Sequence, residues 1–257
     1  MRLNVLLFIL LLFTEVISAQ ESKDQEGFKF SNESEVSIIE TGGNSNVETY
    51  NGKTLSRFEG KKSIYKISGH YIVSFFETED ENGETIKAES ARNWDIMGKY
   101  ERKFTKRING FTALQYEGDV FSGFKQRENI DLGGKYLFLD TDKVKTSFEI
   151  GARYTVEKRV ERNKDGKDKF KFAKGRIYLE HDQVYSEQLS FKLWFEYIPN
   201  FTEGEDYLIN YEPSITVVLS NLFSLKTAYR VNYDNLPNIE GNNRTDYVYT
   251  TSLLTKF

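Results

Sequence analysis

The chain of 257 residues has no cysteine, three prolines, two methionines and two histidines. Without cysteine it forms no disulfide scaffold, no thiol nucleophile and no thiolate metal site. Its mean hydropathy is negative, whereas a helical membrane protein needs about 20 consecutive apolar residues for each spanning helix. These absences exclude a helical membrane protein and a small disulfide-bonded one.

No excess of one charge is present either. The 35 basic and 39 acidic residues give a net charge of −4, and a nucleic-acid-binding protein usually carries a basic surplus on one face. We therefore expect no nucleic-acid partner. With 20 Phe and 16 Tyr the chain is too aromatic to be disordered, and it is long enough to form one or two folded domains.

The first 19 residues differ from the rest. Arg2 precedes the apolar run 5–13 (VLLFILLLF), and Ser18-Ala19 ends the segment with a small residue before Gln20. This pattern is typical of a cleaved secretory signal peptide and less so of an N-terminal anchor helix. We predict a signal peptide over 1–19 and a flexible periplasmic lead over 20–27. The protein is then exported, and without a cysteine after the cut it carries no lipid anchor.

From residue 28 to the end, apolar and polar residues alternate. Between 189 and 197 the apolar residues stand at every second position, and the same holds over 144–156 and 223–233. A period of two indicates strands with one apolar face. The chain is therefore predicted to be all-β, in twelve strands near 28–40, 46–58, 63–77, 86–100, 107–120, 127–138, 144–157, 170–181, 188–198, 206–219, 222–234 and 244–257.

Strand length favours a membrane barrel. Most of these strands have 11–15 residues, whereas strands of soluble proteins centre near 5–6 and a membrane strand needs about 9–11. The first two strands have polar outer faces, so a count of ten remains open. We predict a transmembrane antiparallel β-barrel over 28–257.

The predicted connections alternate in length. Several odd-numbered ones are long and charged, such as 158–169 and 235–243, and several even-numbered ones are tight, such as 220–221. Outer-membrane barrels have long extracellular loops and short periplasmic turns. The last strand ends on Phe257, which resembles the signal read by the barrel assembly machinery. The alternative is a secreted β-sandwich or lipocalin-like barrel, but its apolar face points inward and would expose few aromatics.

Two segments resemble a known family. They are Thr41–Asn46 (TGGNSN) and the tail that runs from Tyr229 through Leu236-Pro237 to Phe257. The chain resembles the salt-induced outer-membrane protein family (YdiY-like), whose domain has no assigned function. The family pattern has Thr-Gly-Asn-Ser, so the doubled Gly42-Gly43 is a departure. The resemblance covers about 28–257 and implies an outer-membrane location, but it supplies neither catalytic residues nor a ligand.

Charged residues on the polar faces are the candidate lining of the lumen. Pairing Leu219 with Phe223 sets Glu212 opposite Arg230, and pairing Phe138 with Val144 sets Gly134 opposite Phe148. Such charges either lock the strand register or select the solute that passes. The candidates are Asp131, Lys135, Glu149, Arg153, Lys192, Glu196, Glu212, Lys226 and Arg230.

Catalysis has little support in the sequence. His70 lies on a polar strand face near Ser68 and Ser74, and His181 lies at a strand end, but nucleophilic catalysis needs a base that contacts the nucleophile and is itself oriented. Phosphate-binding glycine loops are absent. We expect no catalytic residue, no metal and no cofactor, and we keep an outer-membrane lipase or protease using His70 as an alternative.

The expected partners are lipids. The segment 157–174 has eight basic and four acidic residues, which suits either a solvated loop or contact with lipopolysaccharide phosphates. The leading hypothesis is an outer-membrane barrel that forms a narrow channel or passive conduit for small solutes or ions. A closed barrel with a structural or envelope-stress role is the alternative.

Overall fold

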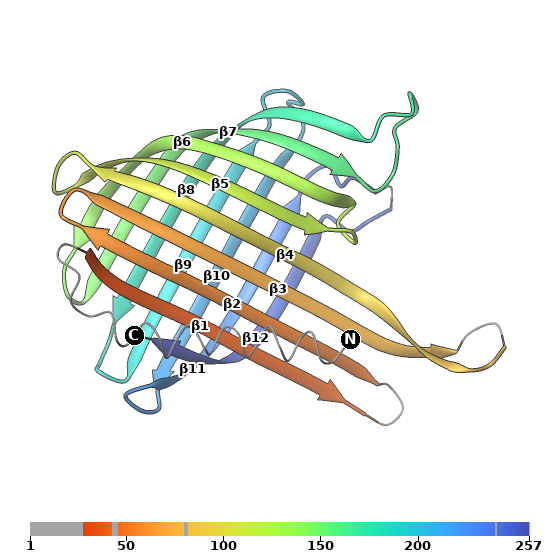
Figure 1. Ribbon diagram of the computed structural model, residues 1–257, viewed down its shortest axis with the longest axis horizontal. Helices are drawn as coiled ribbons and strands as arrows, with labels where there is room; N and C mark the ends of the chain where they lie inside the picture. Colours follow the sequence, from red (N-terminus) through yellow and green to blue (C-terminus); the bar gives the residue numbers. More distant parts are fainter. Residues whose placement is uncertain (1–27, 43–45, 80–81, 240, 257) are drawn as a thin grey trace.

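The computed structural model describes residues 28–42, 46–79, 82–239 and 241–256 as one closed antiparallel β-barrel (Figure 1). Each strand pairs with its neighbours in sequence, and β1 pairs with β12. The strands are β1 (Phe28–Thr41), β2 (Val47–Gly60), β3 (Ser63–Glu79), β4 (Thr85–Lys103), β5 (Ile108–Asp119), β6 (Phe124–Asp140), β7 (Val144–Arg159), β8 (Lys169–Val184), β9 (Leu189–Pro199), β10 (Tyr207–Val218), β11 (Phe223–Asp234) and β12 (Thr245–Lys256).

The twelve strands predicted from the alternation are confirmed, and the ten-strand alternative is wrong. β1 and β2 form a continuous ladder from Phe28↔Gly60 to Thr41↔Val47, despite their polar outer faces. The strands run three residues or fewer beyond the predicted ends, as β6 does at Phe124. The predicted signal peptide (1–19), the lead (20–27) and Phe257 lie outside the described residues.

The inner and outer faces of the wall have opposite chemistry. Outward side chains are apolar and solvent-accessible, including Ile67, Leu132, Ile150, Tyr229 and Tyr249, whereas carboxylates such as Glu101, Glu149 and Glu157 are buried inside. This is the reverse of a soluble sandwich or a lipocalin-like barrel, whose apolar face is covered. An apolar outer band around a polar interior is the organisation of a transmembrane β-barrel.

The residues that the structure describes contain no helix long and apolar enough to cross a membrane.

The two ends of the barrel differ. The loop end carries the odd-numbered connections, including 160–168 and 235–244, which are the longest. The turn end carries the even-numbered connections, the start of β1 and the end of β12. The two longest connections therefore lie at one end of the barrel and the even-numbered connections at the other, as the alternation in the sequence predicts.

One predicted register is correct and one is wrong. Thr216 pairs with Lys226, as the pairing of Leu219 with Phe223 requires. Between β6 and β7, however, Tyr136 pairs with Phe148 and Gly134 with Ile150, a shift of two residues from the prediction. Beside the turn, a bulge at Leu137/Leu139 changes the register by one residue, from Leu139↔Thr146 to Leu137↔Ser147. Because the shift from the prediction is even, every side chain keeps its predicted face.

Glycines allow two strands to approach closely at one side of the wall. Gly133 on β6 pairs with Gly151 on β7, and a Cβ on Gly133 would lie 2.3 Å from the carbonyl oxygen of Ile150 and 2.7 Å from the ring of Phe111. The missing side chains leave lumen space that the buried Phe111 ring occupies. Gly133 is therefore required by close packing at this point.

Candidate functional site

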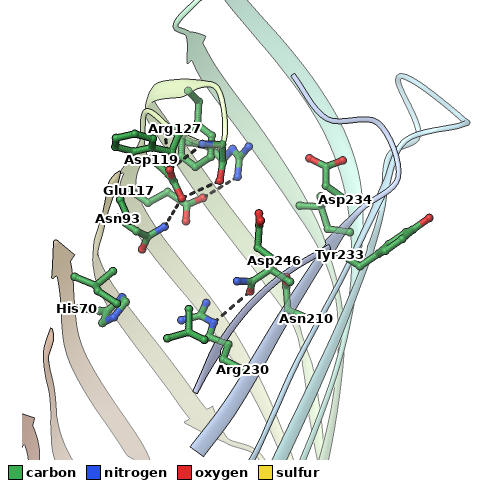
Figure 2. A pocket seen from close by; sticks show the side chains of 18 of the residues that line it. His70, Asn93, Glu117, Asp119, Arg127, Asn210, Arg230, Tyr233, Asp234 and Asp246 are labelled. Atoms are coloured by element: carbon green, nitrogen blue, oxygen red, sulfur yellow. Dashed lines mark hydrogen bonds and ion pairs between the residues drawn. The ribbon is translucent and has the colours of Figure 1, made fainter. Parts of the chain in front are cut away.

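The loop-end half of the lumen contains a cavity of about 560 Å³ (Figure 2). We call it the vestibule. Its lining includes seven carboxylates, six Lys or Arg side chains and eight Asn or Gln amides. Figure 2 shows His70 on one wall and Asp246 and Arg230 on the facing wall. The vestibule is therefore polar and nearly balanced in charge.

Arg127 organises one side of the vestibule. Its guanidinium lies 2.7 Å from Glu157 Oε2 and 3.4 Å from Glu117 Oε1, and it stacks over the Phe124 ring at 3.7 Å. Asn129 also donates to Glu117. Glu157 is almost fully buried, so this cluster fixes β5, β6 and β7 rather than offering free charge.

The β11–β12 connection crosses part of the vestibule mouth. Asn238 Nδ2 donates to Glu157 Oε1 on β7 at 3.0 Å, and Asn242 Nδ2 donates to the carbonyl oxygen of Phe121 at 3.1 Å. Gly123, at φ +91°, packs so closely that a Cβ would lie 2.7 Å from Cβ of Asn238. The connection is thus attached to strands on another side of the barrel and narrows its loop end.

Four charged residues meet at the floor of the vestibule, and we call them the constriction. Lys226 Nζ lies 2.8 Å from Glu35 and 3.5 Å from Glu212. Lys53 Nζ lies 3.9 Å from Glu35 and 3.8 Å from Glu212. These contacts join β1, β2, β10 and β11, so the four side chains meet across the part of the lumen enclosed by the consecutive strands from β2 through β12 to β10. Lys53 keeps 35% of its side-chain exposure, whereas the other three are about 10% exposed.

A second group of charges covers the wall from β3 to β9 toward the turn end, and we call it the wall network. Glu149 is at its centre: its carboxylate lies 2.5 Å from Lys99, 3.5 Å from Lys135 and 2.8 Å from Arg176. Its side chain is 1% exposed. A carboxylate this buried is tolerated because three cations surround it.

Arg153 and Arg176 extend the wall network from Glu149 toward the loop end. Arg153 makes a two-bond contact with Asp131, at 2.7 and 2.8 Å, and Arg176 Nε lies 2.6 Å from Glu196. Lys66 and Lys99 approach Glu101 at 3.0 and 3.6 Å. Bidentate arginine–carboxylate pairs fix geometry in two directions. Arg153 also lies 3.6 Å from Glu196, and Arg176 lies 3.6 Å from Asp131. The network therefore also joins strands that are not neighbours in the wall.

All nine candidate residues lie on the lumen face. Asp131, Lys135, Glu149, Arg153 and Glu196 belong to the wall network, in which Asp131↔Arg153 and Lys135↔Glu149 are directly opposite pairs of the β6–β7 ladder. Glu212 and Lys226 belong to the constriction, and Lys192 pairs with Glu180 and Asp182. Arg230 lies 5.5 Å from the Trp194 ring and donates to Asn232. Whether these residues select a solute stays a prediction.

The sequence reasoning missed other members of these groups, namely Glu35, Lys53, Lys66, Lys99, Glu101 and Arg176. Each lies on a predicted polar strand face, so parity places it in the lumen. Lys99 and Glu149, however, come from β4 and β7, with β5 and β6 between them. Strand pairing rules concern neighbours and give no signal for such a contact.

Neither histidine is hydrogen-bonded to a serine among the described residues. His70 Nε2 contacts Asn51 Oδ1 at 3.1 Å, and its Nδ1 lies 3.5 Å from Asp95. Ser74, a candidate nucleophile near it in sequence, bonds to Thr49 instead. His181 bonds to Thr146. Among the residues with described positions, no three His, Asp or Glu side chains are grouped as metal ligands.

Several solved structures are similar to this chain in fold. The translocator domain of the autotransporter NalP from Neisseria meningitidis is similar at a TM-score of 0.45 and 9% identity, over 99% of this chain and 96% of that one. An outer-membrane channel from Pseudomonas putida F1 gives 0.46 and 6%, over 91% and 97%. A KdgM porin gives 0.42 and 11%, over 89% and 96%.

No curated protein matches the sequence. A family pattern, by contrast, matches residues 34–257, which is nearly the whole described chain. This agrees with the resemblance seen in the sequence to a family whose domain has no assigned function. The chain belongs to the family described as "Protein of unknown function, DUF481".

Proposed function

We propose that the protein is an outer-membrane barrel that passes small polar solutes or ions through a narrow, charge-lined lumen. Solutes enter the vestibule at the loop end, which faces outward, and cross the constriction formed by Glu35, Lys53, Glu212 and Lys226. The observation that carries this proposal is the polar vestibule of about 560 Å³ that ends on these four side chains.

The chemistry of the lining supports small, uncharged or zwitterionic solutes. Its carboxylates and cations nearly cancel, and its eight amides both donate and accept hydrogen bonds. Below the constriction, Lys192 and Asp182 keep 39% and 38% of their side-chain exposure. Charged groups on both sides of the constriction are therefore accessible to water.

Planar-bilayer recording tests the proposal. Folded protein, identified by its heat-modifiable gel mobility, should give small, discrete steps of current. Folded protein without any steps would contradict conduction and favour a closed barrel with a structural or envelope-stress role. That second function is supported by the wall network, whose buried ion pairs occupy much of the turn-end lumen.

We also propose how the protein reaches the outer membrane and what its loops contact there. A cleaved signal peptide over 1–19 and a last strand recognised by the assembly machinery would bring the barrel to the outer membrane. The basic β7–β8 connection would contact lipopolysaccharide phosphates. An outer-membrane lipase or protease is the least supported role, and loss of a hydrolytic activity on His70→Ala would be needed to revive it.

A further inference from the structure

The ladder that closes the barrel is short. β1 and β12 share four residue pairs, from Glu33↔Lys256 to Val36↔Leu253, whereas β1 and β2 pair over the whole length of β1. Among the described residues, Thr245–Ser252 of β12 have no partner on β1. At about 3.3 Å per residue, this leaves a free strand edge of roughly 26 Å. The barrel is therefore sealed near the turn end only.

Above these four pairs the two strands separate. Figure 1 shows β1 and β12 crossing near the turn end and running apart toward the loop end. Among the described residues, β1 and β12 form no pair beyond Val36↔Leu253 toward the loop end. We call the space between them the seam.

The vestibule reaches the seam. Glu35 on β1 and Asp246, Val248 and Thr250 on β12 all line it. Tyr247 lines it too, although it alternates with Asp246 and Val248, so its side chain leaves the opposite face and is 68% exposed. The vestibule therefore reaches the β12 edge of the seam.

The two sides of the seam differ in polarity. On the outer surface it is flanked by exposed apolar side chains, Ile38 on β1 and Tyr249 on β12. Inside the barrel, Arg230 on β11 and Asp246 on β12 form no ion pair with any described residue. The two lie close together along the wall, because Asn232, two residues after Arg230, pairs with Asp246 in the β11–β12 ladder. Unpaired backbone groups at membrane depth are tolerated where they line water. The unpaired N–H and C=O groups of the β12 edge can therefore form hydrogen bonds with a ligand in the seam.

We propose that the seam is a lateral opening through which a single-chain zwitterionic amphiphile moves between the outer leaflet and the vestibule. Its alkyl chain lies along Ile38 and Tyr249, and its head enters the vestibule, the anionic group toward Arg230 and the cationic group toward Asp246. This route goes beyond the proposed conduction, because it uses the wall of the barrel and does not require the constriction to open.

Engineered cysteines test the opening, since the chain has none of its own. Val36→Cys with Leu253→Cys joins a true ladder pair and should form a disulfide under mild oxidation. Ile39→Cys with Thr250→Cys would be opposite if the ladder continued. We expect this second pair to stay reduced and to be joined only by a longer thiol cross-linker. Disulfide formation equal to that of the first pair would overturn the proposal.

Photolabelling tests the ligand. A lysophosphatidylcholine with a diazirine on its chain, added to proteoliposomes of the unaltered protein, should label Ile38, Tyr249 and the lumen-facing Val248. It should label Leu132, on β6, only as ordinary lipid contact. Labelling spread evenly over outward residues, without Val248, would overturn the proposal.

Closing the seam separates the two routes. Cross-linking the Ile39→Cys/Thr250→Cys variant should abolish labelling of Val248 and leave Leu132 unchanged, while conductance through the lumen stays as before. Undiminished labelling of Val248 after cross-linking would contradict lateral entry. Failure of conduction alone would affect the channel proposal and not this one.

Discussion

Lys53 Nζ on β2 and Glu212 Oε1 on β10 lie 3.8 Å apart, although β1, β12 and β11 lie between them in the barrel wall. The contact spans a chord of the lumen. It is part of the constriction, where Lys53 and Lys226 each contact both Glu35 and Glu212. Each of the four should therefore influence both the size and the charge of whatever crosses.

Removing one charge from the constriction should change conduction in a predictable direction. Lys53→Met removes a cation and a cross-lumen contact, so we expect larger current steps and a shift toward cation selectivity. Glu212→Gln should shift selectivity toward anions. The measurement is the reversal potential across a salt gradient, in bilayers that contain one variant.

Lys164→Met is the control for this experiment, because it makes the same charge change in the exposed β7–β8 connection. It should leave conductance and selectivity near those of the unaltered protein. Equal effects of Lys53→Met and Lys164→Met would show that the constriction does not limit the current.

Glu149→Gln should destabilise the barrel. The change leaves Lys99, Lys135 and Arg176 around a neutral amide in a buried site. Removing one partner from a buried ion pair typically costs about 3–5 kcal/mol. We expect a lower urea midpoint for the folded, heat-modifiable form in lipid vesicles. Glu161→Gln in an exposed loop position is the control, and an unchanged midpoint for Glu149→Gln would contradict the central role of Glu149.

Gly133→Ala and Gly134→Ala are neighbouring changes with opposite expected results. A Cβ at Gly133 would overlap the Ile150 carbonyl and the Phe111 ring, whereas the nearest atom to a Cβ at Gly134 is 4.0 Å away. Overpacking costs about 1–3 kcal/mol or more. The yield of heat-modifiable barrel after refolding should fall for Gly133→Ala and stay nearly constant for Gly134→Ala. Equal yields would mean that β6 and β7 can move apart at little cost.

The β11–β12 connection should control access to the vestibule. Asn238→Ala with Asn242→Ala removes its bonds to Glu157 and to the Phe121 carbonyl. A single reporter, Asn210→Cys, should then react several times faster with a water-soluble thiol reagent.

The matched control is Asn163→Ala, which disrupts hydrogen bonds within the β7–β8 connection only. This change should leave the reaction rate at the reporter unchanged. A reporter that reacts no faster in the double variant than in this control would rule out a gating role for the β11–β12 connection.

Much of the architecture is readable from the sequence. Alternation indicates ten or twelve strands, and the parity of Glu149 or Arg230 gives the face on which each lies. Registers are predictable where a turn is short and regular, as between β10 and β11. Between β6 and β7 the pairing differs from the predicted one by two residues, and a one-residue bulge lies beside the turn at Leu137/Leu139. Apolar residues on either side of the turn are compatible with both registers, so the sequence does not distinguish them.

The sequence by itself determined the side of the wall on which each residue lies, since a period of two is a local property of extended backbone. The choice of twelve strands over ten came from the β1–β2 ladder. The tertiary structure decided which lumen charges meet. Lys53 reaches Glu212, and Lys99 reaches Glu149 over the Phe111 ring, because strand tilt, curvature at Gly133 and the width of the lumen set these distances. The separation of β1 from β12 was likewise decided only there, since it depends on how the first and last strands meet after all the others have curved.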